Sequence, residues 1–138
     1  MTDTACPMSS TLIRIAAAVV LDPQGRWLLV RKRHTRSFMQ PGGKMEEGEA
    51  AGVALCRELE EELGLQVEPG RLTECGIRCA PAANEPGHEV EAHLFRLVIE
   101  APVVAAAEIA ELRWVDREEA LRLPLAPLTR DLLLSGLG

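Results

Sequence analysis

The chain alternates between apolar runs long enough for strands and short polar segments that carry turn residues. Residues 13–21 form a β-branched and alanine-rich run, which predicts a buried strand. The next four residues, Asp-Pro-Gln-Gly at 22–25, are a strong turn signal, and a second apolar run covers residues 27–31. The two runs and the turn between them predict a β-hairpin.

A helix with one polar and one apolar side is predicted over residues 49–63. Its apolar side consists of residues that recur at helical spacing: Leu55, Cys56, Leu59 and Leu63. Its polar side carries Ala54 and three glutamates, Glu58, Glu61 and Glu62. Gly64 follows at the position where a glycine commonly ends a helix, so the helix is expected to stop there.

The second half of the chain is predicted to contain further strands and two short helices. Strands are expected over residues 72–80, 88–100 and 112–115, and helices over 116–121 and 127–134. Asp116 is expected to cap the first of these helices. Strands interspersed with helices predict an α/β domain in which a mixed β-sheet lies between helices, an α/β/α sandwich.

The length of 138 residues fits one domain, which we place at residues 11–138, after a short disordered tail at residues 1–10. The net charge of −6 argues against nucleic acid or an anionic membrane as the main partner. It leaves room for a small phosphorylated substrate, because bound divalent cations reverse the local charge.

The chain is expected to be cytoplasmic. It contains no apolar run of membrane-spanning length, and residues 1–10 lack the charged start and apolar core of a signal peptide. Its four cysteines, at positions 6, 56, 75 and 79, form no CxxC pair and are predicted to be reduced structural residues.

Residues 43–65 are the most informative part of the chain, because they contain seven glutamates in a loop and the helix after it. Glu58, Glu61 and Glu62 have spacings that place three carboxylates on one side of a helix with ~3.6 residues per turn. Such carboxylates repel one another, and their oxygens are the ligands that magnesium prefers. The alternative is an acidic helix surface that is simply solvated.

The same segment resembles the Nudix box, the signature of the Nudix hydrolases. The pattern is Gly, five residues, Glu, seven residues, Arg-Glu, an aliphatic residue, any residue, Glu-Glu, any residue, Gly and an aliphatic residue. Every position matches without an insertion: Gly43, Glu49, Arg57, Glu58, Leu59, Glu61, Glu62, Gly64 and Leu65. The resemblance to small, MutT-like members implies the Nudix fold, in which the box forms a loop, a helix and a loop.

The resemblance implies a role for each residue of the box. Glu58, Glu61, Glu62 and the carbonyl group of Gly43 would bind Mg²⁺ or Mn²⁺. Glu58 or Glu61 would also deprotonate the attacking water. Arg57 would orient the carboxylates and pair with Glu49, holding the loop on the helix; the alternative is an ordinary surface arginine.

Two further sets of residues are candidates for the site. The resemblance implies another glutamate ligand from a later loop, for which Glu108 is favoured and Glu111 is the competitor. The basic stretch at residues 31–36 is either a solvated loop or a surface that faces substrate phosphates, with Arg31 and Arg33 as the candidate contacts.

The resemblance implies a hydrolase that cleaves a nucleoside diphosphate linked to another moiety. The substrate is expected to be a small-molecule nucleotide: a nucleoside triphosphate, including oxidised forms, or a nucleotide sugar such as ADP-ribose. Residues 123–127 lack the asparagine that MutT-type enzymes use to read a purine. A catalytically silent nucleotide sensor and an acidic interaction module are the alternatives, and a homodimer is a candidate assembly.

Overall fold

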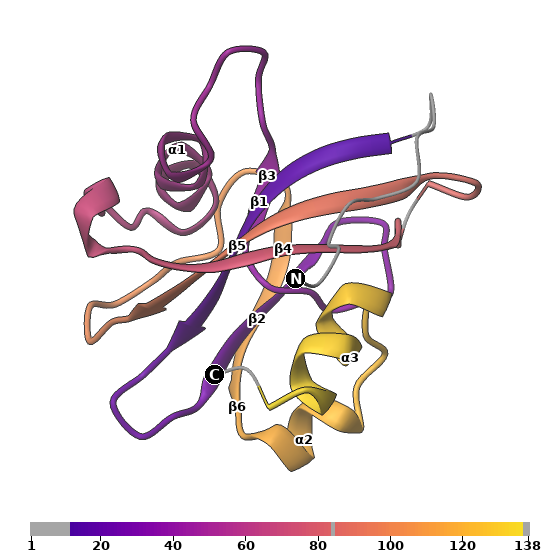
Figure 1. Ribbon diagram of the computed structural model, residues 1–138. Helices are drawn as coiled ribbons and strands as arrows, with labels where there is room; N and C mark the ends of the chain where they lie inside the picture. The colour runs from indigo at the N-terminus through magenta and orange to yellow at the C-terminus, as the bar shows by residue number, and fades with distance from the viewer. Residues whose placement is uncertain (1–11, 84, 137–138) are drawn as a thin grey trace.

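The computed structural model describes residues 12–83 and 85–136, so the tail predicted at residues 1–10 lies outside the described residues. These described residues contain six strands: β1 (Leu12–Leu21), β2 (Trp27–Lys32), β3 (Gly42–Lys44), β4 (Thr73–Pro81), β5 (Glu89–Val98) and β6 (Ile109–Val115). The helices are α1 (Ala51–Leu63), the 3₁₀ turn η1 (Pro69–Arg71), α2 (Arg117–Leu121) and α3 (Pro127–Leu134). Figure 1 shows these elements along the chain.

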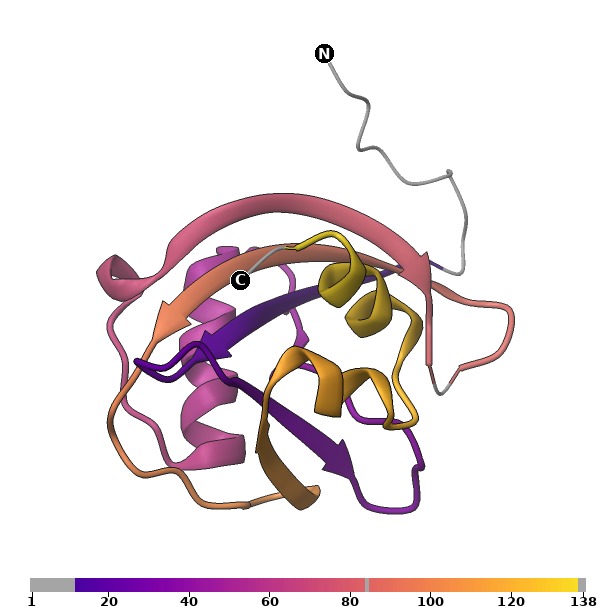
Figure 2. The ribbon, with the colours of Figure 1, turned by 90° about the horizontal axis from the view of Figure 1, so that it is seen from below.

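The strands form one mixed sheet in the order β4-β5-β1-β2-β6, and β3 pairs with β1 beside this path. The central strand β1 runs parallel to β5 from the pair Leu12–Glu89 to the pair Leu21–Val98. β4 and β5 lie side by side as a long antiparallel pair, which Figure 2 shows from below. The predicted mixed sheet is therefore confirmed.

The predicted hairpin of the first two strands forms at its turn, but the strands then separate. β1 and β2 are paired at Leu21 and Trp27, next to the turn. Beyond this point β2 takes β6 as its antiparallel partner, whereas the first half of β1 is covered by β3. The separation leaves room between β1 and β2 for the segment that leads into β3, and Ala18 donates a backbone hydrogen bond to Pro41 there at 2.9 Å.

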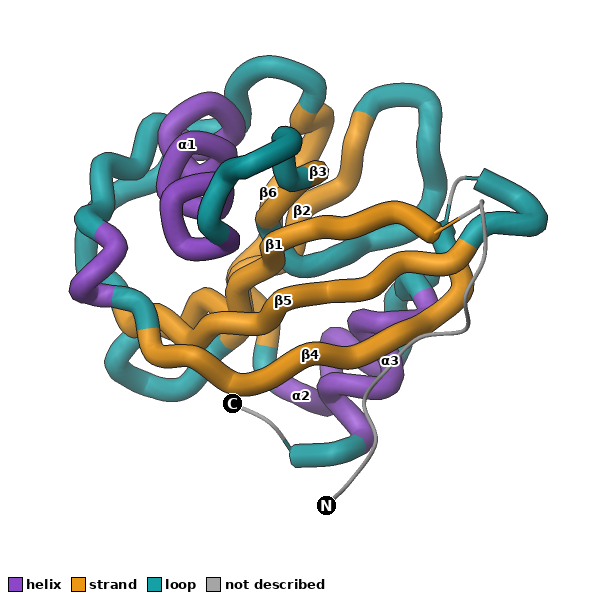
Figure 3. The backbone as a smooth tube through the Cα atoms, turned by 45° about the horizontal axis from the view of Figure 1, so that its top comes forward, coloured by secondary structure: helices purple, strands orange, loops and turns teal. Residues whose placement is uncertain are grey.

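Helices cover both faces of the sheet, as predicted. Figure 3 shows α1 on one side of the strands and the α2–α3 pair on the other. Successive residues of a strand point to opposite faces, and β1 follows this rule with Ala16, Ala18 and Val20 in the core under α1. Ala17, Val19 and Leu21 belong to the second core, under α2 and α3. β1 is thus buried on both faces, which explains its uninterrupted apolar sequence.

Small residues allow β3 to lie close to β1. Gly42 has a φ of +147°, and a Cβ atom at this position would overlap the backbone carbonyl of Ala16. A side chain is therefore excluded here by both conformation and space. The close approach brings Gly43 and Lys44 next to the helix α1.

Several details differ from the sequence-based expectations. β3 was not predicted, α1 begins at Ala51 instead of residue 49, and β6 begins at Ile109 instead of residue 112. Glu62, expected on the polar side of the helix, is only 6% exposed. Cys79 is disulfide-bonded, so the expectation of four reduced cysteines is wrong for this residue, whereas Cys56 and Cys75 are free thiols.

Candidate active site

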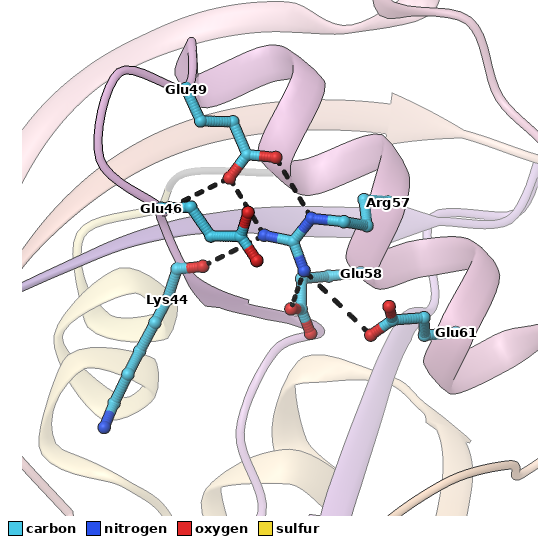
Figure 4. Close-up of polar contacts among 6 residues, drawn as sticks. All are labelled: Lys44, Glu46, Glu49, Arg57, Glu58 and Glu61. Atoms are coloured by element: carbon cyan, nitrogen blue, oxygen red, sulfur yellow. Dashed lines mark hydrogen bonds and ion pairs between the residues drawn. The ribbon is translucent and has the colours of Figure 1, made fainter.

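The loop before α1 is tied to the helix by one arginine. Arg57 Nε donates to Glu49 Oε2 at 3.0 Å, and Nη2 donates to Glu49 Oε1 at 2.9 Å. The same guanidinium reaches the carbonyl oxygen of Lys44 at 3.3 Å. Figure 4 shows Arg57 between the loop and the helix glutamates. The predicted Arg57–Glu49 pair is confirmed, and the Glu49 carboxylate also accepts from the Glu46 amide within the loop.

Arg57 also contacts the metal-ligand candidates. Its Nη1 donates to Glu58 Oε2 at 2.8 Å and lies 4.0 Å from Glu61 Oε1. The ion pair with Glu49 lowers the pKa of that carboxyl group and raises the pKa of Arg57. Arg57 is therefore charged and holds Glu58 by a hydrogen bond in this structure.

The backbone of β3 borders the Glu58 carboxyl group. A Cβ atom at Gly43 would overlap the carboxyl carbon and Oε1 of Glu58. Only glycine leaves the Glu58 carboxylate and the Gly43 backbone side by side without a collision. The structure thus gives a physical reason for glycine at this position, and it places the Gly43 backbone among the same group of oxygens.

Glu62 is a buried carboxyl group with an unused oxygen. Its Oε1 has no hydrogen-bond partner among the described residues, and no other buried side-chain nitrogen or oxygen in that part of the chain shares this property. Burial, and then the negative charge of Glu58, raise the pKa of Glu62 to about 8, against the charge of Lys32 and the amide of Gly42, which lower it. A buried acceptor without a donor is costly unless a ligand completes it.

These carboxylates line one hollow of about 360 Å³. Its lining residues are Lys32, Gly43, Lys44, Glu58, Glu61, Glu62, Ala107 and Glu108. The loop that carries Glu108 is fixed to the end of α1, because Ala106 donates to the Glu62 carbonyl at 2.9 Å and Val104 donates to the Leu63 carbonyl at 3.1 Å. Residues from β2, β3, α1 and this loop therefore meet at one place.

The residues of the hollow fit a divalent cation. The unsatisfied Oε1 of Glu62 lies in a hollow that is also lined by Glu58, Glu61 and Glu108, and carboxylate oxygens are the ligands that such cations prefer. Within the described residues, however, no three Asp, Glu, His or Cys side chains are gathered closely enough to form a ready metal cluster. In this arrangement Arg57 Nη1 contacts Glu58 at 2.8 Å and Glu61 at 4.0 Å.

The structure separates the two glutamates that competed for the loop position. Glu108 lines the hollow. Glu111 lies on β6 and accepts from Arg113 Nε at 2.8 Å and from Arg31 Nε at 3.2 Å. Arg113 is the main cause that lowers the pKa of Glu111, with Arg31 contributing further. The geometry therefore favours Glu108 as the residue that joins the box glutamates.

The basic stretch is placed differently from the sequence-based hypothesis. Arg31 is held by Glu111 and by the Thr35 carbonyl, to which its Nη1 donates at 2.9 Å. Arg33 is exposed. The described lining of the hollow includes neither arginine, and its basic residues are Lys32 and Lys44. Sequence reasoning missed both lysines; the register of β2 shifts between Arg31 and Lys32, so regular alternation would not have located Lys32.

A second, largely apolar cavity of about 130 Å³ adjoins the hollow. The two share Lys32, Gly43 and Lys44, so one bound molecule could occupy both. Apolar side chains from β1, β5 and α3 form much of its wall, including Ile13, Ile15, Val90 and Leu128. The site thus combines a carboxylate-lined hollow, two lysines and a cavity that suits a flat, apolar-faced group.

Comparisons with known proteins agree with this architecture. A family model described as the NUDIX domain matches residues 11–135 of the chain. The octanoyltransferase of Myxococcus xanthus is 38% identical over 129 residues, which cover 88% of this chain and 35% of that protein. The chain thus spans about a third of the length of that relative.

Among the helices of the described residues, none has both the length and the hydrophobicity that a membrane-spanning helix needs.

Two further proteins match over most of their length. The CTP pyrophosphohydrolase of Escherichia coli (strain K12) is 31% identical over 127 residues, which cover 88% of this chain and 89% of that protein. The crystal structure of the MutT protein from Methanosarcina mazei Go1 superposes with a TM-score of 0.76 at 24% identity, covering 93% of this chain and 94% of that chain. The chain therefore belongs to the Nudix hydrolases, enzymes that act on phosphorus-containing anhydrides, and it has the fold of their MutT-like members.

Proposed function

We propose that the protein is a Mg²⁺-dependent pyrophosphohydrolase that cleaves a diphosphate linkage within a nucleotide, with nucleoside triphosphates as its main substrates. One observation carries this proposal. The buried Glu62 carboxylate, with its unsatisfied oxygen, lies in a hollow lined by Glu58, Glu61 and Glu108, and this hollow shares Lys32 and Lys44 with the neighbouring cavity.

The metal would be held by the carboxylates of Glu58, Glu61, Glu62 and Glu108, together with the carbonyl group of Gly43. When bound, Mg²⁺ or Mn²⁺ supplies positive charge that neutralises the phosphates and favours deprotonation of water. The closeness of Glu62 to Glu58 supports this set of ligands. Two neighbouring carboxylates, one of them buried, retain their negative charges most readily beside a cation.

Residues of the chain would carry out proton transfer, phosphate binding and base binding. Glu58 or Glu61 would accept the proton of the attacking water, and Arg57 would hold the Glu58 carboxylate in position. Lys32 and Lys44 would bind the phosphates at the boundary between the hollow and the cavity. The apolar cavity would receive the base and exclude water from it. A phosphate contact by Arg31 or Arg33 stays a prediction.

Nucleoside triphosphates are the first substrates to test. The relative that matches over 88% of this chain and 89% of its own length is named a CTP pyrophosphohydrolase. A nucleotide with one base and one chain of phosphates also matches the shape of the site, in which the carboxylate-lined hollow and the apolar cavity share one boundary. Oxidised nucleotides and nucleotide sugars such as ADP-ribose carry the same linkage and belong in the same screen. A cytoplasmic location and a homodimer remain predictions.

A turnover screen tests the proposal. The purified protein is incubated with Mg²⁺ and a panel of nucleoside triphosphates, oxidised triphosphates and ADP-ribose, and the products are separated chromatographically. We expect a nucleoside monophosphate and pyrophosphate from the triphosphates, and loss of activity in excess chelator that added Mg²⁺ restores. Turnover that persists in chelator would contradict the metal assignment. Nucleotide binding without turnover would instead indicate the silent sensor, and absence of both metal and nucleotide binding would indicate an acidic interaction module.

A matched pair of variants on α1 separates the site from the general charge of the helix. Glu61 is exposed and lines the hollow, whereas its neighbour Glu60 is exposed and contacts Gln66 at 3.4 Å. Glu61→Gln is expected to lower kcat by a factor on the order of 10²–10⁴ without unfolding the protein. Glu60→Gln removes the same charge from the same helix and is expected to leave kcat unchanged. Equal effects of the two substitutions would contradict the role of Glu61.

A further inference from the structure

The cavity beside the hollow contains a buried polar pair. Gln40 is 6% exposed and Thr129 is 0% exposed, and both line the cavity. The Thr129 hydroxyl donates a hydrogen bond to Gln40 Oε1. Burying polar groups in an apolar wall costs free energy, even when they bond to each other. The pair is therefore a candidate for a role in ligand binding.

The backbone fixes the two residues relative to each other. Phe38, two residues before Gln40, donates to the Pro124 carbonyl at 2.8 Å and accepts from the Ala126 amide at 2.9 Å. The segment before β3 is therefore bonded to the segment that begins α3, on which Thr129 lies. Gln40 and Thr129 are held by a rigid frame, which is what a specificity contact requires.

The hydrogen bond determines which end of the Gln40 amide is free. A buried hydroxyl has one hydrogen to donate, and Gln40 Oε1 is the acceptor that it uses. The Nε2 group forms no hydrogen bond with any residue in the described ranges 12–83 and 85–136, although the side chain borders the cavity. In that part of the chain, Gln40 thus has two unpaired N–H donors beside the cavity, whereas its carbonyl oxygen is already engaged by Thr129.

The other polar side chains in the described lining stand near the cavity mouth or the hollow. Lys44 and Glu85 are 67% and 43% exposed and form an ion pair at 3.8 Å. Lys32 is shared with the carboxylate-lined hollow. Among the polar side chains of the described lining, Gln40 and Thr129 are therefore the buried ones.

We propose that Gln40, positioned by Thr129, is a specificity-determining residue that selects nucleotides whose base carries an exocyclic carbonyl oxygen in place of an amino group; this inference rests on the proposed function. Guanine presents O6 and N7 as acceptors, and uracil or thymine presents O4. Adenine and cytosine present an amino group at the corresponding position. An amino group facing the Gln40 amide would bring two donors together and leave both without an acceptor, which a buried site penalises.

The test compares substrates in pairs. The ratio of kcat/KM is measured for GTP against ATP and for UTP against CTP, with the purified protein and Mg²⁺. We expect the carbonyl-bearing member of each pair to be preferred by about tenfold or more, the factor that one neutral hydrogen bond supplies. Both kcat/KM values in a ratio are measured on the same protein. A substitution that lowers activity on all substrates equally therefore leaves the ratio unchanged.

Variants at Gln40 change the chemistry of the contact in two ways. Gln40→Met keeps the shape without the amide and should bring both ratios close to one. Gln40→Glu presents an acceptor to the base and should shift both ratios toward ATP and CTP. Gln66→Met is the matched control, because Gln66 is exposed outside the cavity and its replacement should leave both ratios unchanged. Unchanged ratios in both Gln40 variants would overturn the proposal.

Thr129 acts through Gln40, so its variants need a readout beyond activity. Thr129→Val removes the hydroxyl in a similar shape, which frees the amide to turn, and should lower the two ratios. Thr129→Ser keeps the hydroxyl and should restore them. A purely structural role would change thermal stability and leave the ratios of Thr129→Val at the wild-type values.

Failure of the two proposals can be told apart. If no triphosphate is turned over, the proposed function fails, and calorimetric titration with GMP, AMP, UMP and CMP still measures the base preference directly. Tighter binding of GMP and UMP, lost in Gln40→Met, would support the role of Gln40. Turnover or binding with no preference within either pair would overturn that role while leaving the hydrolase intact.

Discussion

Arg57 and Glu49 are joined by two hydrogen bonds, from Nε to Oε2 at 3.0 Å and from Nη2 to Oε1 at 2.9 Å. This two-point contact links the helix α1 to the loop that follows β3, and the same guanidinium contacts Glu58. A planar fork can hold both carboxylates at once, which a lysine cannot do.

The first prediction concerns this fork. Arg57→Lys keeps the charge and loses the two-point geometry, so we expect a loss of about 1–2 kcal/mol in the free energy of unfolding and a fall in kcat of at least about tenfold. Denaturant unfolding and steady-state kinetics measure the two effects. A wild-type kcat in Arg57→Lys would show that charge alone is sufficient.

The second prediction concerns the buried Glu62. Its pKa is about 8 in the folded, metal-free protein, compared with a usual value of 4.5. Between these values the folded state binds more protons than the unfolded chain, so the free energy of unfolding should fall as the pH rises from 4.5 to about 8. Urea unfolding in chelator, over a pH series across this window, measures the slope.

Two controls accompany the pH series. Glu62→Gln cannot titrate and should show a smaller slope than the wild type in chelator. Mg²⁺ favours the charged carboxylate in the folded state, so saturating Mg²⁺ should reduce the wild-type slope as well. Identical slopes for Glu62→Gln and the wild type in chelator would show that Glu62 titrates normally.

The third prediction separates Lys32 from the exposed arginine next to it. Lys32 lines both the hollow and the cavity, whereas Arg33 is exposed outside their described lining. Lys32→Ala should raise KM and lower kcat/KM for nucleoside triphosphates at least several-fold, because a contact to the phosphates is lost. Arg33→Ala serves as the control. A larger effect at Arg33 would instead support the contact first suggested by the sequence.

The fourth prediction distinguishes the two glutamates of the later loop and strand. Glu108 lines the hollow, and Glu111 is held by Arg31 and Arg113. Glu108→Gln should weaken Mn²⁺ binding several-fold, measured by titration with electron paramagnetic resonance. Glu111→Gln should leave the affinity for Mn²⁺ unchanged and lower thermal stability slightly. The reverse order of affinities would assign the ligand to Glu111.

Local features of the site were predictable from the sequence because they depend on neighbours along one helix. The spacing of Leu55, Leu59 and Leu63 identified the buried side of α1, and Gly64 does adopt the left-handed conformation that ends it, with a φ of +66°. The Asp116 cap was also predictable from the sequence, because Asp116 and Glu119 form a capping box between residues three positions apart.

Features that depend on distant contacts were not predictable. β3 is a strand because Gly42 approaches β1, and the sequence Gly-Gly-Lys has no alternating apolar pattern. Glu62 is buried where α1 meets Gly42 of β3 and the loop at Ala106, and helical periodicity does not reveal these distant contacts. The pairing of Gln40 with Thr129 joins residues 89 positions apart and needed the path of the chain between β2 and α3.

The central claim is that water attacks a phosphorus atom of a diphosphate with the help of a metal-dependent carboxylate site. Its most direct test is hydrolysis of a nucleoside triphosphate in ¹⁸O-labelled water with Mg²⁺, followed by mass spectrometry of the products and of the protein. We predict a nucleoside monophosphate and pyrophosphate, one ¹⁸O atom in only one of these two products, no phosphorylated protein, and no reaction in excess chelator. Release of inorganic phosphate alone, a phosphorylated protein intermediate or full activity in chelator would contradict the account.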